Sequence, residues 1–116
     1  MAAVNETTTL TAEFKFKEIP DEGETATEST SSTFVFGDED HTLGNALRHC
    51  LQQRTADVEF CGYSVPHPTE PYMHLRLQTR GGRAAKAVLG DGLRDLAAMC
   101  TAVKSNVEGE LAQHRR

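Results

Sequence analysis

The sequence predicts an α+β protein: one two-layer domain with two helices on one face of a mixed or antiparallel sheet of about four strands. Three observations predict it. The chain has 116 residues, which suffices for one hydrophobic core. Its apolar residues alternate with polar ones in some segments and recur every three or four residues in others. These segments follow the order strand, strand, helix, strand, strand, helix.

The first 32 residues differ in composition from the rest. They carry seven acidic residues and two lysines, whereas residues 33–116 carry equal numbers of acidic and basic residues. We therefore expect an acidic, partly disordered leader over 1–32 and a folded domain over 33–116. Within the leader, residues 12–19 alternate apolar and charged side chains, which indicates a possible first strand.

A short β-rich run at 33–36 is followed by acidic residues 38–40 and then by a helical pattern. Thr42 is the expected N-cap of this helix. One apolar stripe runs along it, formed by Leu43, Ala46, Leu47, Cys50 and Leu51. Gly44 in the first turn lowers helix stability, so we expect another backbone to approach closely there.

Two further strands are expected at Val58–Val65 and Tyr72–Thr79. The second alternates cleanly, with Met73, Leu75 and Leu77 on one face. Residues 66–71 between them contain three prolines, which cannot donate to a strand ladder, so they form a stiff hairpin loop.

The predicted last helix indicates that the protein has a partner chain. A helix from Ala84 to Leu111 would be about 40 Å long, and a domain of this size has a radius of gyration of only about 13 Å. Its apolar stripe comprises Leu89, Leu93, Leu96, Cys100, Val103, Val107 and Leu111. Part of this stripe should therefore contact another chain. Gly90 and Gly92 weaken the helix, and mark either a later helix start or a close helix crossing.

Several functional classes are disfavoured. No apolar run approaches the roughly 20 residues of a membrane helix, and residues 1–6 do not resemble a secretory signal. An odd number of cysteines argues against a disulfide framework. We expect no metal site, because the potential ligands lack the spacing of a closed site: Cys50, Cys61, Cys100, His41, His49, His67 and His74. We also expect no cofactor site and no catalytic site.

Two alternatives remain open at this level. Cys61 and His67 could pair across the hairpin as a nucleophile and its base in a small enzyme. Arg80, Arg83 and Lys86 form a small basic cluster that could bind nucleic acid, although a solvated loop is the commoner explanation of such a cluster.

The segment Asp40-His41-Thr42-Leu43-Gly44-Asn45-Ala46-Leu47-Arg48 resembles the alpha-type assembly subunits of DNA-directed RNA polymerases. Gly62-Tyr63, His67-Pro68 and Leu75-Arg76-Leu77-Gln78-Thr79 extend the resemblance, which covers about residues 33–111. The short 66–71 loop leaves no room for the inserted domain of the larger members. Residues 58–63 and 78–81 most resemble the small subunit shared by RNA polymerases I and III, and the polymerase II and archaeal counterparts are the alternatives.

The resemblance implies a non-catalytic subunit of the nucleus, including the nucleolus. It would pair with a larger alpha-like subunit as a platform for the other polymerase I and III subunits. It would meet DNA only through that complex. The family's dimer contact involves the first helix and the long last helix. The expected interface residues are Leu43, Gly44, Leu47, Leu51, Leu89, Leu93, Leu96, Cys100 and Val103.

Overall fold

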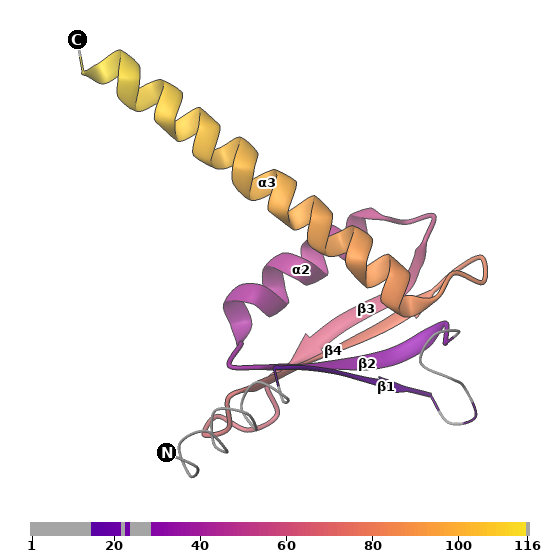
Figure 1. Cartoon of the computed structure of the whole chain (residues 1–116). Coiled ribbons are helices and arrows are strands. Elements are labelled where there is room, and N and C mark those ends of the chain that lie inside the picture. The colour runs from indigo at the N-terminus through magenta and orange to yellow at the C-terminus, as the bar shows by residue number, and fades with distance from the viewer. Residues whose placement is uncertain (1–14, 22, 24–28, 116) are drawn as a thin grey trace, which may run out of the picture.

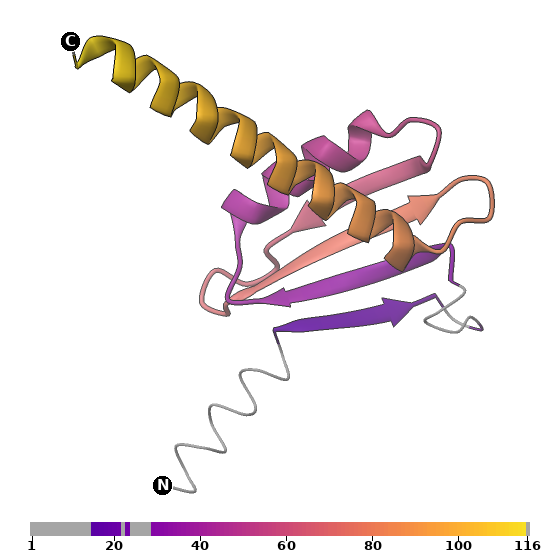
Figure 2. The same cartoon turned by 45° about the horizontal axis from the view of Figure 1, so that its top comes forward.

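The computed structural model describes residues 15–21, 23 and 29–115 of the chain. Their order of elements is β1 (Phe16–Pro20), β2 (Ser31–Gly37), α2 (His41–Gln53), β3 (Val58–Ser64), β4 (Tyr72–Thr79) and α3 (Ala85–His114). The strands form an antiparallel sheet in the order β1-β2-β4-β3. Both helices lie on the same face of this sheet (Figures 1 and 2). The predicted fold class is confirmed.

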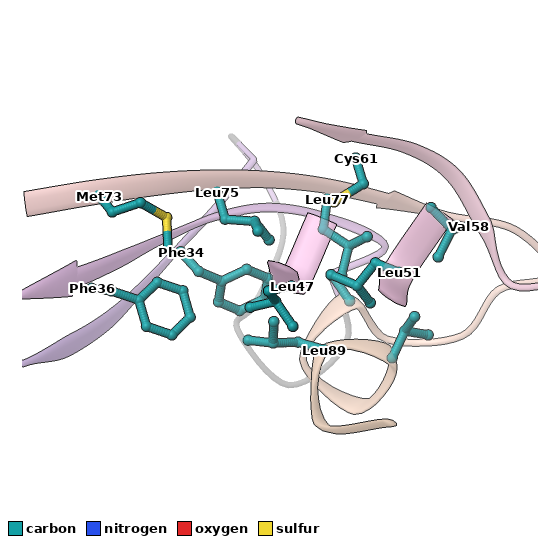
Figure 3. Packing of buried hydrophobic residues seen from close by; sticks show 12 residues of the cluster. Phe34, Phe36, Leu47, Leu51, Val58, Cys61, Met73, Leu75, Leu77 and Leu89 are labelled. Carbon is teal, nitrogen blue, oxygen red and sulfur yellow. The ribbon is translucent and has the colours of Figure 1, made fainter. Parts of the chain in front are cut away.

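The core lies between the helices and the two central strands. Along β2 and β4 every second residue is buried, because one face of the sheet is covered by the helices and the other is not. Phe34 lies opposite Leu75 in the register, and Phe36 lies opposite Met73. Leu47 of α2 packs beside Phe34 in this cluster (Figure 3).

The folded unit begins earlier than the predicted boundary at residue 33. Strand β1 pairs antiparallel with β2, so that Phe16 lies opposite Phe36, and their rings are 5.2 Å apart. Ser29 and Ser32 are completely buried. The expected strand at 12–19 is thus found at Phe16–Pro20 within the described residues, while residues 1–14 lie outside them.

The N-cap of helix α2 lies two residues before the predicted one. Its N-cap is Asp40, not Thr42, because the Asp40 carboxylate accepts a hydrogen bond from the Thr42 backbone N–H at 3.2 Å. A carboxylate at this position also complements the positive end of the helix dipole. The acidic residues before the helix therefore contain the cap itself.

Helix α3 leaves the domain part-way along its length. Its buried residues are Ala85, Val88, Leu89 and Gly92. Every residue from Ala97 to Arg115 is exposed, and the helix projects away from the sheet in Figure 1. With 30 residues it is about 45 Å long. Neither helix in the described part of the chain has the length and hydropathy needed to cross a membrane.

Candidate protein-binding surface

The projecting part of α3 carries a continuous apolar surface, which we call the α3 stripe. It consists of Leu93, Leu96, Met99, Cys100, Val103, Val107 and Leu111. Apart from the adjacent pair Met99 and Cys100, they follow one another in steps of three and four residues, which places them on one helix face. Val103, Val107 and Leu111 are 56%, 52% and 49% exposed. Large apolar side chains in a contiguous exposed row are typical of a surface that another protein covers.

The predicted interface residues divide into two groups. Leu47 and Leu51 are 0% exposed and Leu89 is 2% exposed, so these leucines are core residues of the chain itself. Gly44 is buried as well. These four residues are therefore not part of the accessible surface of the free chain, and their contact with a partner stays a prediction. The physical reason is that the first half of α3 lies across α2 and covers the stripe that sequence periodicity left unpartnered.

The other five predicted residues remain accessible to different degrees. Leu93, Cys100 and Val103 are exposed on the α3 stripe. Leu43 and Leu96 are partly buried and pack against the edge of the core. These five remain predictions of a contact. Met99, Val107 and Leu111 belong to the same surface, and the helical period that predicted the others also identifies them.

Gly44 is explained by an aromatic side chain of the same chain. A Cβ atom at this position would lie 2.4 Å from Cδ2 of Tyr63, which is closer than two non-bonded carbon atoms approach in proteins. The Tyr63 ring, which comes from β3, therefore occupies the gap that we expected another backbone to fill. Its hydroxyl lies 2.9 Å from Nδ1 of His41, and the Arg48 guanidinium lies 5.5 Å from its ring centroid.

Gly92 marks the crossing of the two helices, one of the two predicted possibilities. A Cβ atom there would lie 2.5 Å from Cδ2 of Leu51. The absent side chain lets α3 approach α2 closely at this point.

A cluster of arginines and aspartates surrounds this crossing. Arg54, directly after α2, donates two hydrogen bonds to the Asp95 carboxylate of α3, at 2.7 and 3.0 Å. Arg83 pairs with Asp91 at 2.9 Å and with Asp57 at 3.2 Å. Hydrogen bonds from Arg94 and Arg83 hold the pKa of Asp91 below its ordinary value.

The enzyme alternative is not supported by the positions of its two residues. Cys61 is 5% exposed, lies opposite Leu77 in the register and faces the core. Burial raises the pKa of its thiol to about 11, which disfavours the nucleophilic thiolate. His67 is exposed in the loop beyond the end of β3. Over the residues that the structure describes, no three His, Cys, Asp or Glu side chains are placed to hold a metal ion.

The basic cluster is largely engaged within the molecule. Arg83 forms the ion pairs described above. The Nε of Arg80 donates to the carbonyl oxygen of Val58 at 3.2 Å. Two of the three cations that could contact phosphate are therefore held by the domain's own groups, which weakens the nucleic-acid alternative.

Comparison with known proteins identifies related sequences. Residues 31–106 match the model of the RNA polymerase Rpb3/Rpb11 dimerisation domain. The chain is 48% identical over 81 residues to the DNA-directed RNA polymerases I and III subunit RPAC2 of Saccharomyces cerevisiae, covering 70% of this chain and 56% of that protein. It is 47% identical over 83 residues to RPAC2 of Drosophila melanogaster, covering 72% and 77% of the two chains.

A solved structure shares the fold. It is the DNA-directed RNA polymerase subunit L of Thermoplasma acidophilum, with a TM-score of 0.67 and 16% sequence identity, over 86% of this chain and 91% of that one. At this level of identity the similarity concerns the fold alone.

Proposed function

Since the chain belongs to the RNA polymerase Rpb3/Rpb11 dimerisation-domain family, we propose that it is a non-catalytic assembly subunit of DNA-directed RNA polymerases I and III. It forms a heterodimer with a larger alpha-like subunit, and this dimer is the platform on which the other subunits assemble. The protein works in the nucleus, including the nucleolus. It supports synthesis of ribosomal RNA precursors and of small RNAs such as 5S rRNA and tRNA, and it meets DNA only through the complex.

The observation that carries this proposal is the α3 stripe within the matched domain. The apolar side chains of this helix face are 37% to 56% exposed at Leu93, Met99, Val103, Val107 and Leu111. Keeping this apolar surface in contact with water is unfavourable in free energy for an isolated protein. The family model describes a dimerisation domain and reaches residue 106, so it includes Leu93 to Val103. The heterodimer supplies the apolar surface that covers the stripe.

Assignment to polymerases I and III rests on the relatives. The proteins of yeast, zebrafish and fruit fly that resemble the chain at 43% to 48% identity all carry that name. Because the chain spans 56% of the length of the yeast relative, the complete function of that protein is part of the proposal. The alternative is the equivalent small subunit of RNA polymerase II or of an archaeal polymerase.

Co-expression with a larger alpha-like subunit tests the heterodimer. In Val103→Asp a charge replaces an exposed apolar side chain in the middle of the α3 stripe. It should abolish co-purification, because the charge would be buried without a partner. The matched control is Ser105→Asp, two residues away on the opposite face of the same exposed helix segment. The control should co-purify like the wild type.

Two results would contradict the proposal. A wild-type chain that remains a separate monomer beside the alpha-like subunit would exclude the heterodimer. Retention of the complex by Val103→Asp would exclude the α3 stripe as its interface. Mass spectrometry of the large subunits captured with a tagged chain decides the polymerase class. Capture of the largest subunits of polymerases I and III would support the proposal, whereas capture of the polymerase II subunit alone would favour the polymerase II alternative.

A further inference from the structure

Beyond Gly92, few contacts hold α3 to the rest of the domain. Beyond Leu96 the helix has no buried residue, and Ala97 to Arg115 are all exposed. The segment from Asp95 to Arg115 is about 30 Å long, so a rotation of about 10° at its base would move its end by about 5 Å. That displacement equals about one helical turn.

The first contact is the crossing at Gly92. Leu51 of α2 packs where a Cβ of Gly92 would stand. Before the crossing, Ala85, Val88 and Leu89 hold the start of α3 in the core, and beyond it Leu96 packs against the edge of the core. These apolar contacts are not directional. A second, directional contact beyond the crossing would narrow the range of angles at which the rest of the helix leaves the domain.

Arg54 and Asp95 supply that second contact. Asp95 lies three residues after Gly92 and is thus on the same side of α3. The guanidinium of Arg54 donates from Nε and Nη2 to the two oxygens of Asp95. A bidentate pair constrains orientation as well as distance, because both groups are planar.

The backbone of Arg54 is itself held firmly. Its N–H donates to the carbonyl oxygen of Leu51 at 3.1 Å, and its carbonyl oxygen accepts from Asp57 and Val58 at 3.0 and 2.9 Å. Its guanidinium also pairs with Asp57 at 3.3 Å. The junction between α2 and β3 is therefore a fixed base for the contact to α3.

We propose that the bidentate pair between Arg54 and Asp95 sets the direction of α3, and thereby presents the α3 stripe at the angle at which the alpha-like partner binds it. The second half of this statement rests on the proposed function. Both residues act as positioning residues, since they lie outside the stripe itself. A helix that already has the binding angle in the free chain loses less conformational entropy when the partner binds.

Substitutions of Arg54 separate orientation from charge. Arg54→Lys keeps the positive charge but cannot form the two parallel hydrogen bonds. Arg54→Met keeps most of the alkyl stem and loses the charge. The matched control is Arg94→Gln, because Arg94 bonds to Asp91 within α3 and does not join two elements.

The direct measurement is a distance distribution between two spin labels in the free full-length chain. Exposed Lys17→Cys and Ser105→Cys carry the labels, and Cys100→Ala removes the exposed native thiol. Cys50 and Cys61 are buried, and desolvation raises the pKa of both thiols, so they react slowly. A narrow distribution is expected for the parent and for Arg94→Gln, and a clearly broader one for Arg54→Met and Arg54→Lys.

Binding to the alpha-like partner is the second measurement. Arg54→Met and Arg54→Lys should each raise the Kd by about fivefold, the scale of one well-formed surface ion pair. Arg94→Gln should leave the Kd unchanged. A narrow distance distribution in both Arg54 variants would overturn the inference, even with weakened binding, because Arg54 would then act without directing α3.

The two proposals can fail separately. If the wild-type chain does not bind the alpha-like partner, the proposed function fails, and the distance distributions still decide whether Arg54 directs α3. If the wild-type chain binds and the Arg54 variants bind equally well, the proposed function stands, and the role of Arg54 in presenting the stripe is excluded.

Discussion

At Gly44 a single hydrogen atom in place of a side chain decides how β3 packs on α2. The Tyr63 ring occupies the space where a Cβ would be. We predict that Gly44→Ala lowers the free energy of unfolding by about 1–3 kcal/mol, because the overpacking exceeds the gain in helix propensity. Urea unfolding of the free chain measures this change.

Gly90→Ala is the matched control, since this glycine also lies inside a helix. A Cβ there would meet only the flexible end of the Arg94 side chain, at 3.6 Å. This variant should gain up to about 1 kcal/mol in stability. Equal effects of the two substitutions would contradict the role given to Tyr63.

Residues of one chemical type have different environments in this chain. Leu47 and Leu51 are fully buried, whereas Leu93 and Leu111 are 37% and 49% exposed. All four lie on the apolar stripes of helices. Periodicity identified the stripes correctly, but it could not say which stripe the chain covers by itself, because that depends on where the two helices cross.

Among the elements, the junction between α3 and the loop before it depends on an ionised carboxylate. Asp91 accepts hydrogen bonds from Arg94 and Arg83, so its pKa in the folded chain is below the ordinary 3.8. A lowered folded-state pKa stabilises the fold above the unfolded value and loses this effect as the pH falls through the folded value.

We therefore predict that Asp91→Asn is less stable than the wild type at pH 6, and that this difference shrinks as the pH falls below about 3.8. Urea midpoints of both chains between pH 6 and pH 3 provide the measurement. A difference that stays constant down to pH 3 would show that the carboxylate charge of Asp91 has no role in the junction.

For the molecule as a whole, the free chain has one well-packed part and one exposed helix. Amides of β2 and β4 lie in the centre of the sheet, while those of residues 97–114 belong to a helix segment in which every residue is exposed. A helix of this length is marginal without packing.

Hydrogen exchange should therefore be fast over residues 97–114 in the free chain and slow over β2 and β4. Binding of the alpha-like partner should slow exchange in the 97–114 segment, since the heterodimer buries the α3 stripe. Unchanged fast exchange of this segment inside a stable heterodimer would place the interface elsewhere.

Local sequence patterns determined the α+β class, the order of the elements and the surplus apolar surface of the last helix. They could do so because strand and helix periods are properties of neighbouring residues. Only the tertiary structure decided that α3 covers Leu47 and Leu51, that Tyr63 occupies the gap at Gly44, and that Arg54 reaches Asp95. These are contacts between residues far apart in the chain, and the crossing of two helices, not the period of either one, brings them together.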